Sequence, residues 1–99
     1  MNQFIVAQSG KIINLSSVKL ITDSPEKSCI SAFIDLGQDS SVELYSSQNA
    51  ELRDYILDRI TYSIKNTRVI INIPEFIKDA EDAPDVYLTK HYKHQDVPQ

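Results

Sequence analysis

Several residue types that catalysis and membrane insertion depend on are scarce in this sequence. A single cysteine, Cys29, rules out an internal disulfide. Only two glycines are present, which leaves no glycine-rich phosphate loop and no nucleophile elbow. The apolar runs are far shorter than the roughly 18 residues that a membrane span needs. The sequence therefore predicts no membrane crossing and carries no catalytic signature.

The overall composition is that of an ordinary globular domain. Apolar residues make up 41% and charged residues 24% of the 99 residues, so we expect one domain with one ordered core. The first residues have neither a positive charge nor a long apolar stretch, which predicts a cytoplasmic location rather than secretion. The net charge of −4 argues against autonomous binding to nucleic acid.

The first half of the sequence has the pattern of β-strands. Between residues 3 and 46, apolar and polar residues alternate between short clusters of Ser, Gly, Asp and Pro. Ser9 and Gly10 predict a tight hairpin, while Ser16 and Ser17 form so weak a break that the second and third strands could be continuous. The pattern predicts an antiparallel meander of four to five strands. These strands are expected at residues 4–7, 11–15, 18–22, 29–36 and 42–45.

A helix is predicted over residues 48–65 as the cover of this meander. Leu52, Ile56, Ile60 and Ile64 recur at every fourth position and form one apolar stripe. We expect Ile56 and Ile60 to pack against the apolar face of the sheet. Ser46 or Ser47 could cap the first turn of this helix.

Residues after the helix predict a sixth strand and a different C-terminal region. Residues 68–73 are rich in β-branched side chains and stop at Pro74. This strand could return to the sheet edge, or it could pair with the same strand of a second copy. A short helix could then run from Pro74 to about Ala80. We assign residues 1–73 to a single α+β domain and residues 74–99 to an acidic, polar, extended tail.

No group of residues in the sequence has the pattern of a catalytic or metal site. His91 and His94 could share a helix face, but two ligands are too few for zinc. Asp54 and Asp58 lie four residues apart, off the apolar stripe, so we expect both in solvent. Cys29 falls inside an expected strand and is interpreted as structural. We predict no catalytic residue, no cofactor and no metal.

The N-terminal part of the sequence resembles a loose group of short uncharacterised bacterial and phage proteins. The resemblance covers residues 4–64 and is carried by the segment from Phe4 to Val18, which reads FIVAQSGKIINLSSV, followed by the meander and the helix. The order of strands and helix is similar to small pleckstrin-homology-like modules, although five strands are fewer than the seven of such barrels. The resemblance implies a fold but no activity.

The apolar residues that follow the helix give the functional hypothesis. Six large apolar side chains occur within nine positions, after the chain already has a sheet and a covering helix: Val69, Ile70, Ile71, Ile73, Phe76 and Ile77. We therefore expect a non-enzymatic protein-interaction module that self-associates through residues 68–77. One alternative is a small regulatory or nucleic-acid-associated protein using Tyr87 to His94. Another is an enzyme whose site forms only between subunits.

Overall fold

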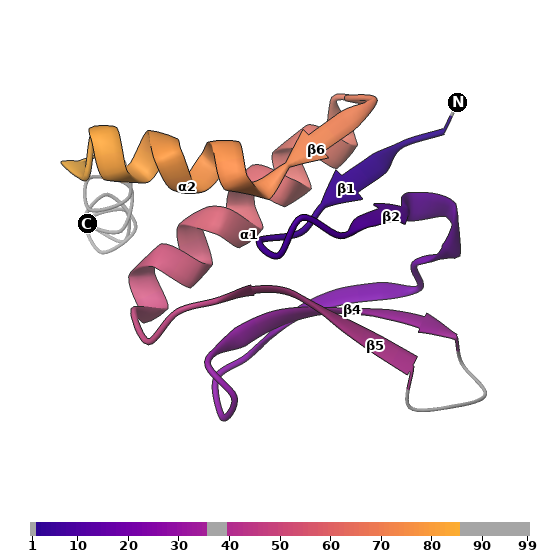
Figure 1. Cartoon of the computed structure of the whole chain (residues 1–99), viewed down its shortest axis with the longest axis horizontal. Helices are drawn as coiled ribbons and strands as arrows, with labels where there is room; N and C mark the ends of the chain where they lie inside the picture. Colours follow the sequence, from indigo (N-terminus) through magenta and orange to yellow (C-terminus); the bar gives the residue numbers. More distant parts are fainter. Residues whose placement is uncertain (1, 36–39, 86–99) are drawn as a thin grey trace, which may run out of the picture.

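Two three-stranded sheets and two α-helices make up the α+β fold of this chain (Figure 1). The structure, a computed structural model, describes residues 2–35 and 40–85. The predicted α+β class is therefore confirmed. The arrangement of the strands differs from one continuous meander, because the six strands in the described part of the chain divide equally between the two sheets.

The first sheet pairs an early hairpin of the chain with a strand that follows much later in the sequence. Its strands are β1 (Phe4–Val6), β2 (Ile12–Asn14) and β6 (Ile70–Asn72), in the order β2-β1-β6. The predicted β1–β2 hairpin is confirmed: the two strands are antiparallel, and Gly10 has a φ of 95° in the turn. β6 pairs with β1 in parallel, so the sixth strand does return to a sheet edge.

The second sheet is an antiparallel meander of β3 (Leu20–Ser24), β4 (Cys29–Asp35) and β5 (Ser40–Ser46), with β4 in the centre. Of the two possibilities left open for the second and third strands, the structure has the separated one, because a short 3-10 helix, Leu15–Ser17, lies between them. The side chain of Asn14 accepts a hydrogen bond from Ser16 N and turns the chain there. This local turn carries the chain from the first sheet to the second.

Helix α1 (Ala50–Lys65) follows β5 within the predicted range. Its N-cap is Asn49, whose side chain accepts hydrogen bonds from Glu51 N and Leu52 N, rather than Ser46 or Ser47. Ser47 does not cap the helix. Its hydroxyl accepts a hydrogen bond from the backbone N–H of the N-cap residue Asn49. The helix ends at the C-cap Asn66.

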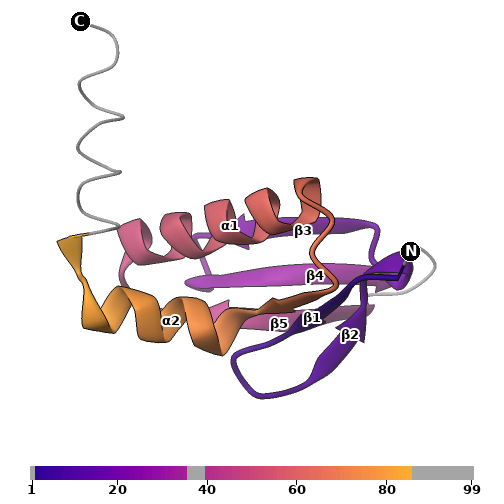
Figure 2. The same cartoon turned by 90° about the horizontal axis from the view of Figure 1, so that it is seen from above.

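Helix α2 (Ile73–Asp82) begins directly after β6 and runs side by side with α1 (Figure 2). Asn72 caps it through Glu75 N, and Pro74 occupies a position in its first turn where the missing N–H is not needed. Ile73, Phe76 and Ala80 are buried. The core therefore extends past residue 73, where we expected the domain to end.

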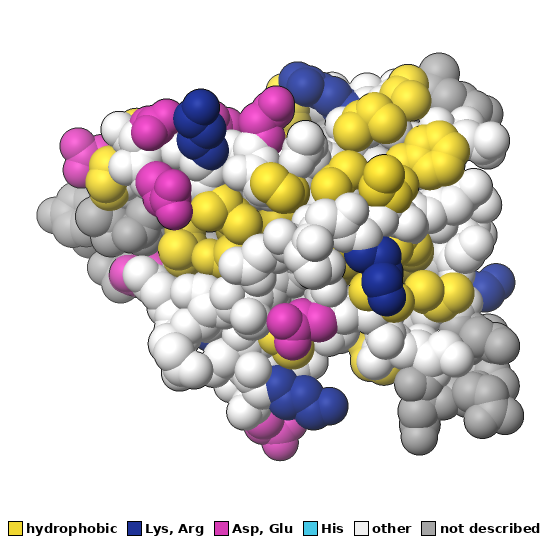
Figure 3. Space-filling model, in the orientation of Figure 1, with side chains coloured by type: hydrophobic (Ala, Val, Ile, Leu, Met, Phe, Trp, Pro, Cys, Tyr) yellow, Lys and Arg dark blue, Asp and Glu magenta, His cyan; other side chains and the backbone are white. Residues whose placement is uncertain are grey.

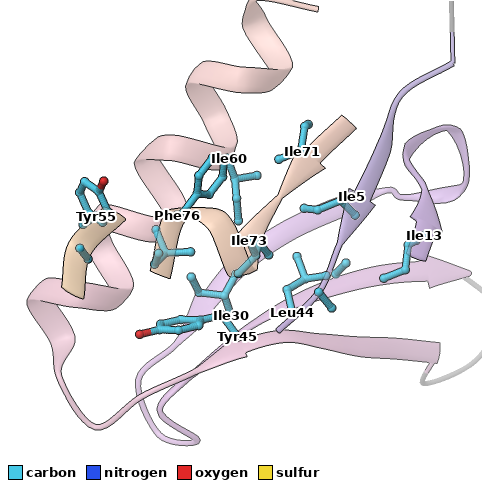
Figure 4. Close-up of a cluster of buried hydrophobic side chains, with 14 residues drawn as sticks. Ile5, Ile13, Ile30, Leu44, Tyr45, Tyr55, Ile60, Ile71, Ile73 and Phe76 are labelled. Carbon is cyan, nitrogen blue, oxygen red and sulfur yellow. The ribbon is translucent and has the colours of Figure 1, made fainter. Parts of the chain in front are cut away.

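The hydrophobic core lies between the two sheets and the two helices (Figure 4). Ile56 and Ile60 of α1 are buried in the same cluster as Ile30 of β4. The fully buried large side chains come from both sheets and both helices: Ile5, Ile30, Leu44, Ile56, Ile60, Ile71 and Ile73.

Candidate functional site

The first sheet has an apolar side chain at most positions on both of its faces. Ile5, Ile13 and Ile71 point into the core and are buried. Side chains alternate along a strand, so the remaining strand positions point to the opposite face. We call these the outer sheet face, and its six positions are Phe4, Val6, Ile12, Asn14, Ile70 and Asn72.

Four of the six side chains on the outer sheet face are apolar and none is charged. Ile12 is 66% exposed and Ile70 is 53% exposed, while Phe4 and Val6 are half-buried. The register places Phe4 beside Ile70, and Val6 beside Ile12. Hydrophobic side chains accordingly gather over the region of β1 and β6, whereas most acidic side chains lie toward α2 (Figure 3).

The six residues that we predicted as an interface are divided by the fold. Ile71, Ile73 and Phe76 are buried in this chain's own core, and Ile77 packs against that core. The reason is that β6 pairs with β1 and α2 packs against α1, so these side chains need no second chain. Val69 and Ile70 remain half exposed.

Three apolar residues of the outer sheet face were missing from the predicted interface: Phe4, Val6 and Ile12. A strand with water on one face alternates apolar and polar residues. The segment from Phe4 to Ala7 is apolar throughout, and Ile12 and Ile13 are adjacent apolar residues. These unbroken runs were the available signal that both faces of β1 and β2 are apolar.

A cavity of about 400 Å³ lies between α1 and the segment formed by β6 and α2. Tyr55, Arg59 and Tyr62 line it from α1, where a spacing of three to four residues places them on one helix face. Ile70 of β6 and Phe76 of α2 form part of the opposite wall. We call this cavity the α1–β6 groove.

Arg59 is a charged group of the α1–β6 groove with contacts to three neighbouring side chains. Its guanidinium lies over the ring of Phe76, 4.4 Å from the ring centroid, and Nη1 donates a 2.6 Å hydrogen bond to the hydroxyl of Tyr55. Nη2 lies 3.5 Å from Oδ2 of Asp79, and both side chains are more than a third exposed, so this ion pair is weak. The guanidinium is thus held in place with donors left over.

The other residues considered for catalysis or metal binding form no such site in the part of the chain that the structure describes. Cys29 is buried in β4, with its sulfur 3.5 Å from the hydroxyl of Ser31. Asp54 is exposed as expected, whereas Asp58 is partly buried and already engaged in a contact. Across residues 2–35 and 40–85, no three His, Cys, Asp or Glu side chains are grouped to hold a metal ion. His91, His94 and the Tyr87–His94 patch lie outside the described residues.

Comparison with protein-family models, curated proteins and solved structures gives no match to this chain. The resemblance to short bacterial and phage proteins stays a prediction. Neither helix in the described part of the chain is long and apolar enough to cross a membrane.

Proposed function

We propose that this chain is a non-enzymatic protein-interaction module that self-associates through the outer sheet face. The observation that carries the proposal is the apolar character of four of the six positions on that face. Sheets with one solvated face normally place polar side chains there, and exposed apolar patches mark interaction sites. This surface includes Ile70, one of the two predicted interface residues that stay exposed, while the other, Val69, adjoins it.

Charge favours a second copy of this chain as the occupant of the outer sheet face. Two copies that each carry a net charge of −4 repel one another over most of their surfaces. The six positions of the outer sheet face carry no charge, and the acidic residues Glu75, Asp79, Glu81 and Asp82 belong to α2. Contact through this face therefore brings two copies together without placing acid against acid.

Sheet geometry permits the same contact. Two sheets can stack face to face about 10 Å apart, with their side chains interdigitated. A twofold axis through the outer sheet face would let the same patch of both copies form the interface. The patch is small compared with the roughly 800 Å² per partner of a standard interface, so we expect a dissociation constant in about the micromolar range.

The first prediction concerns Ile12→Asp, which places a charge on the outer sheet face. Because Ile12 is 66% exposed, the substitution leaves the core intact and acts on the interface. Sedimentation velocity over a series of micromolar concentrations is expected to show a monomer–dimer equilibrium for the natural chain. The Ile12→Asp variant is expected to sediment as a monomer throughout the series.

Leu20→Asp is the matched control for this prediction. Leu20 is 55% exposed, but it lies on β3 of the second sheet. This variant should dimerise like the natural chain. At a concentration low enough to keep all three proteins monomeric, circular dichroism should show the same thermal transition for each. A natural chain that stays monomeric, or equal weakening by both substitutions, would rule out self-association through this face.

A further inference from the structure

We propose that the α1–β6 groove binds an extended acidic peptide, which adds a strand to β6 and places a carboxylate on Arg59. This site shares Ile70 and Asn72 with the outer sheet face, but it uses the backbone edge of β6 and the side chains of α1, so the inference goes beyond self-association. Three features of the described residues carry it: the position of β6, the shape of the groove and the unfilled donors of Arg59.

β6 is an edge strand with a free side. Within the described sheets its only strand neighbour is β1. Phe4 N donates to the carbonyl of Val69, so the polar groups of Val69 and Ile71 face β1. Backbone groups alternate along a strand, and those of Ile70 and Asn72 therefore face the other way. An unpaired strand edge is a template for an added strand.

The α1–β6 groove lies along this free side. Ile70 and Asn72 are the two residues of β6 that line it, and α1 supplies the opposite wall. Figure 2 shows α1 running side by side with α2, and in Figure 1 α1 passes behind β6. A groove bounded by a strand edge and a helix lets a peptide pair with the strand while its alternate side chains enter the cavity.

The charged residues of the groove favour an acidic side chain. Arg59 and Arg68 line the cavity, together with Asp58 and Glu75. Asp58 is engaged in a contact within the chain, and Glu75 lies in the first turn of α2, where the helix N-terminus offsets its charge. The arginines therefore provide the groups that a ligand can pair with.

Arg59 is prepared to bind a carboxylate. The stack on Phe76 and the hydrogen bond to Tyr55 fix the guanidinium before any ligand arrives, which lowers the entropy lost on binding. Its contact with Asp79 is long enough to be exchanged for a shorter, charge-assisted one. An extended peptide fits both the strand edge and this arginine, whereas a free anion would use the arginine alone.

The test uses two capped peptides, acetyl-Thr-Val-Glu-Val-Thr-amide and the same peptide with Gln in place of Glu. Titration into the full-length ¹⁵N-labelled chain is expected to shift the backbone amides of Ile70 and Asn72 and the Arg59 Nε–H signal. The Glu peptide should bind about tenfold more tightly than the Gln peptide, because one charge-assisted hydrogen bond is lost.

Arg59→Gln should remove the preference for the Glu peptide while leaving weak binding of both. Lys65→Gln is the matched control, since it makes the same change of charge on the exposed end of α1, outside the lining of the groove. It should keep the preference. Ile12→Asp should bind both peptides like the natural chain, so a failure of self-association is distinguished from a failure of this site.

Four outcomes would overturn the proposal. They are no shift with either peptide, equal affinity of the natural chain for both, shifts confined to another strand edge, and an Arg59 Nε–H shift produced by inorganic phosphate but by neither peptide. The last result would identify a simple anion site.

Discussion

At the scale of single residues, Arg53 connects three parts of the fold. Only 5% of this residue is exposed on the buried side of α1. Its Nε donates a 2.8 Å hydrogen bond to Oδ1 of Asp23 on β3, and Nη1 donates a 2.7 Å bond to the carbonyl of Ser47 before the helix. One side chain thus joins the second sheet, the loop after β5 and the helix.

We expect Arg53→Ala to destabilise the chain by about 3 kcal/mol, because breaking a buried ion pair leaves its partners unsatisfied. This loss of stability is at the lower end of the range for broken buried ion pairs, because the side chain of Asp23 is 31% exposed to water. Urea unfolding followed by circular dichroism measures the change. The double variant Arg53→Met with Asp23→Leu should recover part of the loss. If the double variant is as unstable as Arg53→Ala, the destabilisation by Arg53→Ala comes from lost packing and not from the broken ion pair.

The sequence predicted the apolar part of this helix face but not its polar part. Leu52, Ile56, Ile60 and Ile64 indicated which side of α1 is buried, yet the buried residues also include Arg53 and Ser63. Arginine is normally a surface residue, so its burial depends on an acceptor supplied from elsewhere. Asp23 lies 30 positions earlier in the chain, and nothing local to α1 indicates this partner.

At the scale of elements, the turn between α1 and β6 contains local backbone strain. Thr67 has a φ of 52°, in the left-handed region that a β-branched residue rarely adopts. It follows the C-cap Asn66, at the position where most helices with this ending have glycine. Thr67 N donates to the carbonyl of Ile64 and Arg68 N donates to that of Ser63, so the turn is well bonded despite the strain.

Thr67→Gly is expected to stabilise the chain by about 1 kcal/mol, since glycine avoids the steric cost of the left-handed conformation. Thr61→Gly is a suitable comparison, because Thr61 is an exposed residue inside α1. That change should instead destabilise, since glycine weakens a helix interior. The midpoint of thermal unfolding should therefore rise for the first variant and fall for the second. A fall for both would show that the turn stores no relievable strain.

Element boundaries were predictable where the signal was local. The range of α1 follows from periodicity within one segment, and the Gly10 turn follows from a single residue. The cap of α1 was misplaced, because Ser46, Ser47 and Asn49 can all accept hydrogen bonds from a first turn, and only the path of the chain after β5 selects Asn49. The turn at Asn14 was also missed, because the sequence around it does not show that the Asn14 side chain accepts a hydrogen bond from Ser16 N.

At the scale of the whole molecule, the second helix is part of the core and not of a tail. Ile73 is completely buried, and Phe76 and Ala80 pack in the same cluster. The acidic composition of residues 74–99 predicted a polar extension, since the average charge hides Phe76 and Ala80, which share one helix face with Ile73.

Ile73→Ala should lower the free energy of unfolding by about 2–5 kcal/mol, the range for truncating a buried isoleucine. Ile70→Ala is the matched control three residues earlier, where the side chain is 53% exposed, and it should change stability far less. Urea unfolding compares the two at a concentration low enough to keep both monomeric. Equal, small effects would place α2 outside the core.

The pairing of strands is what local pattern could not provide. The parallel contact of β1 with β6 joins residues 66 positions apart, Phe4 to Ile70, and either strand alone is only three residues long. The same pairing decides which apolar residues stay exposed. The sequence therefore shows that many apolar residues are present, but not which of them form the outer sheet face.

The pairing of β1 with β6 also determines how late in synthesis the first sheet can be completed. Ile5 is synthesised before Asn72, so β1 gains its second strand neighbour only after Asn72 has been added. The meander of β3, β4 and β5 needs only contacts between consecutive strands and can form earlier. Until Asn72 has been added, the β1–β2 hairpin has apolar side chains on both faces and lacks its third strand, so this hairpin is where a chaperone has most to protect.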